Sequence, residues 1–348
     1  MALNSAGGTS LLLGSTDVPP VLEHNAAGRS PFLLTCDHYG RLIPRVLGDL
    51  GLPESELTRH IAWDIGIAGV AEALSGHLDA HLIAQRYSRL VIDCNRPPQA
   101  ISSIPTISEA TAIPGNEGLT REAIEARRRQ IFDPYHRRIT EVIDQRLRDG
   151  RPTALVSLHS FTPVYAGVAR PWHIGTLYHR DTKLAPLLLK LLRREPDLVV
   201  GDNEPYAVDD ATDYTIPVHG EARGLMNTGI EIRQDLIADP AGQKQWADRL
   251  ANIFGEIEMI LRAQGSLPAK DFRCPCCKFK TLHGRGQDEI CPVCFWQDDG
   301  QDEEEAELVF GGPNRDLSLR QAQTNFRLIG AIDERWKTKV RPPEPDEA

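Results

Sequence analysis

The sequence has fewer basic than acidic side chains and no long apolar run. Lys and Arg total 39 against 49 Asp and Glu, which gives a formal net charge of −10 at pH 7. Because binding to a nucleic acid backbone depends on clustered cations, this deficit argues against a nucleic acid partner. No stretch approaches the roughly 18 apolar residues of a membrane helix, and Leu-Leu-Leu at residues 11–13 lacks the basic flank of a signal peptide. We therefore expect a cytoplasmic protein without a membrane or nucleic acid partner.

Cysteine is sparse except in one short segment near the C-terminus. Five of the seven cysteines fall within residues 274–294. In a reducing compartment such clustering favours metal binding over disulfides. Two Cys-x2-Cys pairs separated by thirteen residues can each supply two thiolates to one tetrahedral zinc ion, with Cys276 left over. The predicted ligands of this structural zinc are Cys274, Cys277, Cys291 and Cys294.

The length of the chain predicts two domains. A chain of 348 residues exceeds the usual size of one domain. Its beginning is rich in Gly, Ser, Asn and Pro without periodicity, and Gly-Ser-Leu-Pro at residues 265–268 suits a linker ahead of the cysteines. We divide the chain into an irregular segment 1–29, a large domain 30–267 and a small cysteine-rich domain 268–348.

Long amphipathic stretches in the large domain predict helices. Apolar residues recur at helical spacing over residues 55–78, 120–148 and 241–263. In the second stretch Thr120 is a suitable N-cap, Asp133-Pro134 predicts a kink, and Gly150 is a suitable stop.

Short apolar runs between these stretches predict strands. Strands separated by helices indicate an α/β fold, with a mostly parallel or mixed sheet covered by helices on both faces. Ligands of such sheets lie beyond the carboxyl ends of the strands. The predicted strands are residues 31–36, 80–84, 89–93, 153–159, 198–201 and 229–233.

Two histidines stand at the ends of predicted strands. His38 follows the strand over residues 31–36 and His159 ends the strand over residues 153–159, so both are placed at the edge that binds ligands. A neutral imidazole is a natural zinc ligand, although either residue alone could be a hydrogen-bonded loop histidine. A third candidate is Asp64, which the predicted helix puts on one face with His60; a surface His/Asp pair is the alternative.

Five motifs follow one another over about residues 30–264. They are Asp-His at 37–38 with Ile-Pro at 43–44, His-Ile-Ala-Trp-Asp-Ile-Gly at 60–66, Tyr-Ser-Arg-Leu-Val-Ile-Asp-Cys-Asn-Arg-Pro at 87–97, His-Ser-Phe-Thr-Pro at 159–163, and Gly-Ile-Glu-Ile-Arg-Gln-Asp at 229–235. In this order they resemble the motifs of the N-formylglutamate amidohydrolases. Through its Cys-Pro-Cys-Cys and Cys-Pro-Val-Cys-Phe-Trp runs, the segment from Cys274 to Ile329 is likewise similar to the small cysteine-rich CPCC domains.

The resemblance implies a zinc-dependent amidohydrolase with a fold similar to the zinc carboxypeptidases. The implied substrate is an N-acyl amino acid, N-formylglutamate or a related acidic compound. The resemblance also implies that His38 and His159 are imidazole ligands of a catalytic zinc. We favour Asp64 as the carboxylate ligand, and Asp37 stays open as the alternative.

The later motifs imply catalytic and substrate-binding residues. Glu231 resembles the general base that takes a proton from water and returns it to the leaving nitrogen, and a salt bridge with Arg233 is the alternative. Two guanidinium groups could clamp the carboxylates of an acidic substrate, unless either one pairs with Asp93. The predicted substrate-binding residues are Arg89, Asn95, Arg96 and His219.

Two other functions stay open on the sequence. One is a carboxypeptidase-like hydrolase of a different amide or peptide. The other is a non-catalytic zinc adaptor, for which the sequence names no protein partner. Metal content separates the hypotheses, because the enzyme would hold about two zinc ions per chain and the adaptor about one.

Overall fold

A computed structural model describes residues 11–267, 272–286 and 288–348. The chain divides into two units, Met1–Ile260 and Leu261–Ala348. The predicted domain boundary near residue 268 lies outside the described residues. Within the described ranges, no helix is both long and apolar enough to cross a membrane.

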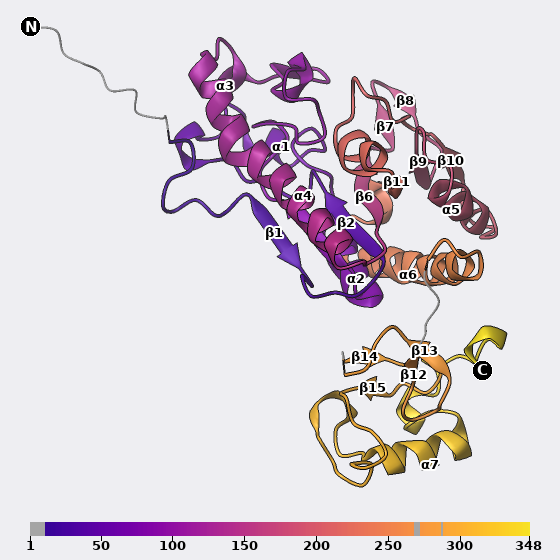
Figure 1. Ribbon diagram of the computed structural model, residues 1–348. Helices are drawn as coiled ribbons and strands as arrows, with labels where there is room; N and C mark the ends of the chain where they lie inside the picture. The colour runs from indigo at the N-terminus through magenta and orange to yellow at the C-terminus, as the bar shows by residue number, and fades with distance from the viewer. Residues whose placement is uncertain (1–10, 268–271, 287) are drawn as a thin grey trace, which may run out of the picture. The chain divides into compact units, whose positions relative to one another are not determined.

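A seven-stranded mixed sheet forms the centre of the first unit, in the order β1-β3-β2-β6-β11-β9-β10 (Figure 1). The four strands β3, β2, β6 and β11 are parallel, whereas β1 pairs antiparallel with β3 and β9 pairs antiparallel with β11. This confirms the predicted α/β class with a mixed sheet. The strands are β1 Val21–His24, β2 Phe32–Cys36, β3 His81–Gln85, β6 Ala154–Phe161, β9 Ile174–Leu177, β10 Val200–Asp202 and β11 Met226–Arg233.

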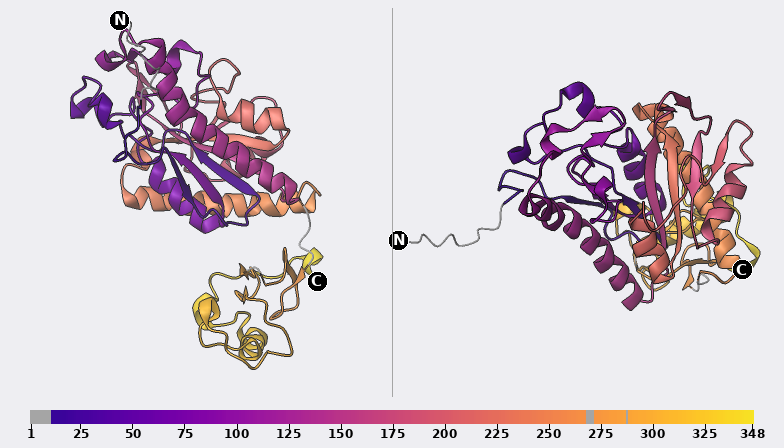
Figure 2. Two further views of the ribbon diagram at one scale, coloured as in Figure 1. Left: turned by 60° about the vertical axis from the view of Figure 1, so that its left-hand side comes forward. Right: turned by 90° about the horizontal axis from the view of Figure 1, so that it is seen from above.

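Helices cover both faces of this sheet. Leu33 belongs to a buried cluster with Ile139 of α4. Its neighbour Phe32 points to the opposite face, where its ring lies 4.8 Å from that of Phe254 in α6. Figure 2 shows α4 and α6 on opposite sides of the sheet. The helices of this unit are α1 Glu54–Leu57, α2 Ile67–Leu78, α3 Arg121–Arg127, α4 Asp133–Arg148, α5 Leu184–Leu192 and α6 Pro240–Ala263.

The predicted helix over residues 120–148 is present, and a wider turn interrupts it just before the predicted kink at Asp133-Pro134. The Thr120 side chain accepts a hydrogen bond from the backbone N–H of Ala123, as an N-cap does. A π-helical turn, Arg128–Phe132, joins α3 to α4. Pro134 has no N–H to donate to the preceding turn and needs space for its ring, and the wider turn meets both requirements.

Three local predictions are wrong. Residues 89–93 form a turn rather than a strand, and the apolar run reflects burial in the core, because Leu90, Val91 and Ile92 are at most 1% exposed. Strand β1 lies within the segment 1–29 that we expected to be irregular; every residue of it is half-buried, so it lacks the alternation that marks a strand. Residues 60–64 lie between α1 and α2 and are not helical.

Two small hairpins flank the first unit's cavity, which is described below. They are β4 Ile107–Ser108 with β5 Thr111–Ala112, and β7 Val164–Tyr165 with β8 Val168–Ala169.

In its described residues, the second unit has two short hairpins and the α-helix α7 around the cysteines, besides short 3-10 turns. The hairpins are β12 Phe272–Arg273 with β13 Lys280–Leu282, and β14 Glu289–Ile290 with β15 Gln297–Asp298. Helix α7, Leu319–Ile329, begins with a capping box between Ser318 and Gln321. The fully buried Trp296 packs with the cysteines and with Leu319, so the metal-ligand candidates form much of this core.

Candidate metal centre and active-site cavity

The structure brings His38, Asp64 and His159 together in the first unit. The Nδ1 atoms of His38 and His159 lie 3.5 Å and 3.1 Å from the same oxygen, Oδ2 of Asp64. One ligand atom from each residue lies within 4.8 Å of the others, and all three side chains are buried. Two imidazole nitrogens and one carboxylate oxygen are the donor set of many catalytic zinc sites.

Strand pairing explains how residues far apart in the sequence meet. Strands β2 and β6 are parallel neighbours, so His38, just after β2, and His159, near the end of β6, reach the same sheet edge. Asp64 comes from the loop between α1 and α2, which is fixed by a hydrogen bond from its backbone N–H to the His38 carbonyl. Gly66 has φ +80°, and a Cβ there would meet the Ile237 carbonyl at 2.0 Å, so this turn of the loop requires glycine.

The other nitrogen of each imidazole faces a second carboxylate. Nε2 of His38 lies 2.8 Å from Asp93 Oδ1, and Nε2 of His159 lies 3.2 Å from Asp37 Oδ2. Asp37 also accepts a hydrogen bond of 2.6 Å from the Thr215 hydroxyl. Carboxylates in this position orient metal-ligating imidazoles and raise their basicity. Of the two imidazoles, Asp37 thus contacts that of His159 alone, through its outer nitrogen Nε2. Asp64 faces the inner nitrogen Nδ1 of both histidines.

The charges at this point are strongly coupled. Burial lowers the pKa of His38, but the carboxylates of Asp93 and Asp64 outweigh it, so the net shift is upward. Burial raises the pKa of Asp64, yet His38, His159 and Arg89 bring it well below its usual value. The Nδ1 atom of His38 is buried and has no hydrogen-bond partner among the described residues, which leaves it available to a cation.

Glu231 lies beside the candidate ligands. It is the register partner of His159 on the adjacent parallel strand β11. Its side chain is buried, and Oε2 has no hydrogen-bond partner in the described part of the chain. Burial raises the pKa of Glu231 to about 7, despite the opposing effect of His159. Arg233, the alternative partner considered for Glu231, instead pairs with Asp235 at 2.8 Å.

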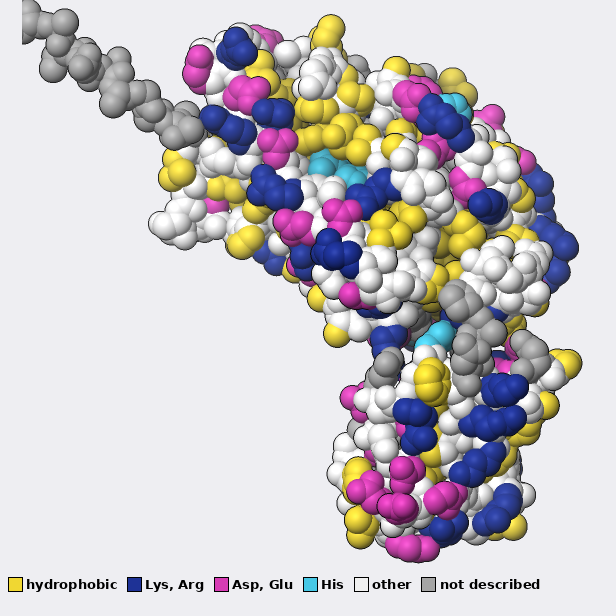
Figure 3. Space-filling model, viewed as in Figure 1, with side chains coloured by type: hydrophobic (Ala, Val, Ile, Leu, Met, Phe, Trp, Pro, Cys, Tyr) yellow, Lys and Arg dark blue, Asp and Glu magenta, His cyan; other side chains and the backbone are white. Residues whose placement is uncertain are grey.

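The three candidate ligands and Glu231 line a cavity of about 520 Å³. Figure 3 shows histidine side chains on this face, with apolar and charged side chains around them. Arg89 lines the cavity but donates hydrogen bonds to Asp64 at 3.2 Å and to Asp93 at 2.9 Å. Arg96 also lines it, and no hydrogen bond or ion pair of its side chain is found within the described ranges.

Asn95 and His219 are placed differently from each other. Asn95 lines the cavity, but its side-chain oxygen accepts from the backbone N–H groups of residues 214 and 215 and its nitrogen donates to Asp213, so it fixes this loop. His219 does not line the cavity; it is 2% exposed, and its Nε2 lies 2.9 Å from Nδ1 of His136. The structure therefore does not bring His219 to the cavity but buries it in the core beneath the loop, and its role in substrate binding stays a prediction.

The sequence reasoning missed His136 and the part played by Asp93 toward His38. Nε2 of His136 lies 2.7 Å from the Cys94 carbonyl and so donates to it, which leaves Nδ1 to accept from His219. Burial lowers the pKa of His136 to about 4 and that of His219 to about 3. The spacing of His136 three residues before the apolar Ile139 of α4 was the one signal that could have placed it inside.

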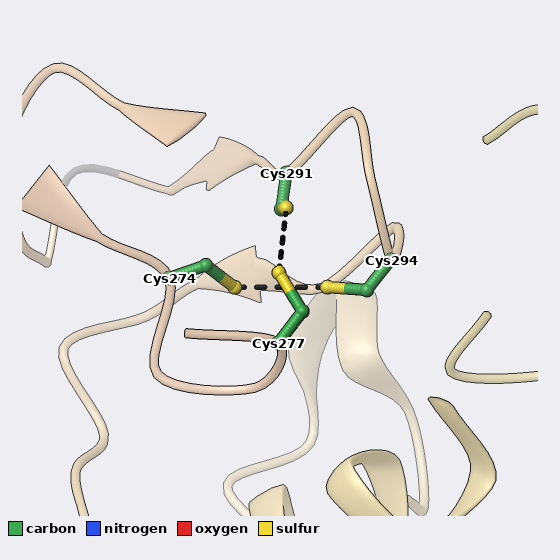
Figure 4. Close-up of side chains that lie close together, drawn as sticks. All are labelled: Cys274, Cys277, Cys291 and Cys294. Carbon is green, nitrogen blue, oxygen red and sulfur yellow. Dashed lines mark hydrogen bonds between the residues drawn. The ribbon is translucent and has the colours of Figure 1, made fainter. Parts of the chain in front are cut away.

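Four cysteines meet in the second unit (Figure 4). Cys274 Sγ lies 3.6 Å from Cys294 Sγ, and Cys277 Sγ lies 3.5 Å from Cys291 Sγ. All four sulfur atoms lie within 4.8 Å of one another, and all are free thiols. Cys276 is buried outside this group. Four convergent thiols are compatible with one tetrahedral zinc ion.

Two family models match this chain, each over a different range of residues. Residues 30–238 match the family model of N-formylglutamate amidohydrolase, and residues 272–347 match that of the cysteine-rich CPCC domain. No curated protein sequence matches the chain.

Two solved structures resemble the large unit. One is the crystal structure of gene product Atu2144 from Agrobacterium tumefaciens, with 39% sequence identity and a TM-score of 0.70. The match covers 72% of this chain and 99% of that chain. The N-formylglutamate amidohydrolase from Ralstonia eutropha JMP134 is 19% identical, covers 71% of this chain and 100% of its own, and has a TM-score of 0.53. At 19% identity the second likeness concerns the fold alone.

Proposed function

The chain belongs to the N-formylglutamate amidohydrolase family, whose members hydrolyse an amide, and from this premise we propose that it is a metal-dependent hydrolase of N-acyl amino acids. The observation that carries the proposal is the convergence of His38, Asp64 and His159 beside Glu231 in one cavity. This arrangement joins a cation site to a general base at the carboxyl ends of parallel strands.

The residues of the centre fit a divalent metal, and zinc suits them best. His38 and His159 would bind it through Nδ1 and Asp64 through Oδ2, while Asp93 and Asp37 keep the imidazoles in orientation. When bound, such an ion lowers the pKa of a coordinated water toward about 7 and polarises the acyl oxygen.

Glu231 supplies the proton transfers. Its carboxylate takes a proton from the attacking water as the new C–O bond forms, and returns it to the amide nitrogen as the C–N bond breaks. The products are a carboxylate and a free amine. Burial raises the pKa of Glu231 above that of an ordinary carboxyl group, which helps it to hold the proton between the two transfers.

Arg96 is the proposed anchor of the substrate. Its guanidinium is unengaged in the described part of the chain and lines the same cavity, so it can bind the α-carboxylate in a two-pronged way. Arg89 holds Asp64 and Asp93 in place. The family makes N-formylglutamate the first compound to test.

The second unit is proposed to hold a structural zinc. Cys274, Cys277, Cys291 and Cys294 would bind it as thiolates. Such a small core around four cysteines lacks the buried area to be stable alone, so metal binding should supply much of its folding free energy.

The test is hydrolysis of a panel of N-acyl amino acids by the purified full chain, with and without a chelator, together with metal analysis. We expect chelator-sensitive release of free amino acid and about two zinc ions per chain. An active protein that holds about one zinc and keeps full activity in chelator would contradict the metal-dependent mechanism. A protein inactive on every compound would leave the adaptor hypothesis.

A further inference from the structure

The cavity offers one unengaged cation to a substrate. Among the described residues its lining contains two arginines and no lysine. Arg89 is held between Asp64 and Asp93, at 3.2 Å and 2.9 Å, so two carboxylates already balance its charge. Arg96 has no hydrogen bond or ion pair of its side chain within the described ranges, although its charge favours the ionised forms of the nearby Asp93 and Asp213. Among the described lining residues, Arg96 is therefore the counter-charge open to a substrate carboxylate.

The other charged groups of the lining away from the candidate metal centre are acidic. Glu109 Oε2 lies 2.5 Å from Arg59, outside the lining, and 3.3 Å from His60. Asp213 lines the cavity as well, and its carboxylate accepts a hydrogen bond of 3.1 Å from Asn95 without an ion pair in the described ranges. Arg59 balances the charge of Glu109, so the like charge that a second substrate carboxylate would meet is that of Asp213, which disfavours its binding.

The remaining wall of the cavity is apolar and partly open. Ile107 on the β4–β5 hairpin is 64% exposed, and Tyr165 and Tyr206 are each 43% exposed. The Arg170 guanidinium lies 4.7 Å from the Tyr165 ring centre and 4.8 Å from that of Tyr206, and donates a 2.8 Å hydrogen bond to the Tyr206 hydroxyl. This clamp holds both rings in place. Apolar side chains also lie beside the histidines in Figure 3.

Exposed apolar side chains at the mouth of a polar cavity are suited to bind an apolar part of a ligand. We propose, on the basis of the amidohydrolase function above, that the preferred substrate is an N-acyl amino acid with a single carboxylate, bound by Arg96, and an uncharged apolar side chain. That side chain packs against Ile107, Tyr165 and Tyr206. Derivatives of glutamate are poor substrates.

The first experiment compares kcat/KM for N-formyl-L-phenylalanine and N-formyl-L-glutamate in the full-length, zinc-loaded protein. We expect the phenylalanine compound to be favoured by about tenfold or more. A preference for the glutamate compound overturns this inference and leaves the amidohydrolase function standing. Absence of hydrolysis with either compound and with the wider panel removes both.

Variants test the two parts of the recognition separately. Ile107→Ser should lower kcat/KM for the phenylalanine compound about threefold to tenfold, and by a clearly larger factor than kcat/KM for N-formylglycine, which has no side chain to contact it. Ile101→Ser is the matched control, because Ile101 is 95% exposed and lies outside the lining. Asp213→Asn should raise kcat/KM for the glutamate compound relative to that for the phenylalanine compound, because it removes one like charge. Equal effects of Ile107→Ser on both neutral compounds would contradict the proposed contact.

A binding measurement separates recognition from turnover. Calorimetric titration of the Glu231→Gln variant should give tighter binding of N-formyl-L-phenylalanine than of N-formyl-L-glutamate. The reverse order would overturn the inference even if both compounds are hydrolysed by the wild-type protein.

Discussion

Replacing Glu231 with glutamine removes one charge from the cavity and keeps the shape of the side chain. The group lies beside His159 on an adjacent strand, and no ion pair of its carboxylate is found in the described ranges, so the substitution breaks no salt bridge. A positioned general base contributes roughly 10²–10⁴-fold to a rate. We therefore expect kcat to fall by about two orders of magnitude or more, which is a loss of at least about 2.7 kcal/mol of transition-state stabilisation.

The assay is the initial rate of formate release from an N-formyl amino acid at saturating concentration, with zinc content and thermal midpoint measured on the same samples. Glu256→Gln is the matched control, because Glu256 is a surface residue of α6 paired with Arg194 at 2.6 Å. Zinc content and folding should be the same in both variants. Full activity of Glu231→Gln would remove this residue from the mechanism, and loss of activity together with one zinc would make it a ligand instead.

Three further substitutions probe the rest of the structure. Asp93→Asn should weaken metal binding in the first unit by about 10–100-fold, because the outer nitrogen of His38 loses its charged partner; competition with a chromogenic chelator measures this, and unchanged affinity would refute the role. Replacing Cys277 and Cys294 together with Ser should unfold the second unit and remove about one zinc per chain while hydrolysis persists. If hydrolysis is lost together with the fold of the second unit, the two units are not separable. The His136–His219 pair should make the protein sensitive to acid. Burial lowers both pKa values, to about 4 and about 3, so between pH 6.5 and 4 the unfolded state binds more protons than the folded state and stability falls as the pH falls. Each histidine contributes up to about 1.4 kcal/mol per pH unit in that window, and urea unfolding of His219→Asn at pH 7 and pH 5 should show a smaller loss than the wild type.

Much of the large domain could be predicted because its helices and central strands bury complete faces. Strands β2, β3 and β6 are buried along their whole length and β11 along all but its two end residues, as parallel strands covered on both faces are. β1 and β9 were missed because both have four residues; β1 is only partly buried, and β9, although buried, has Gly and Thr at its centre in place of an apolar run. The cytoplasmic location stays a prediction.

The candidate site was predictable in its donors and less so in its surroundings. His38, His159 and Glu231 stand at strand ends, a position visible in the sequence. Asp64 was chosen for a helical spacing with His60 that the structure does not contain. The loop brings it to the two histidines for another reason, the hydrogen bond from its backbone N–H to the His38 carbonyl. Arg89 and Arg96 looked equivalent in one motif, yet only contacts with Asp64 and Asp93 distinguish them.

The sequence by itself determined the fold class, the family and the four thiols of the second unit, because apolar periodicity and close cysteine spacing are patterns among residues that are near one another in the chain. Tertiary structure alone decided which carboxylate faces both imidazoles, which arginine is left to bind a substrate, and that His219 lies in the core. Those outcomes depend on which segments, up to 178 residues apart in the case of the contact between Asp37 and Thr215, come within hydrogen-bond distance, and sequence spacing carries no information about that.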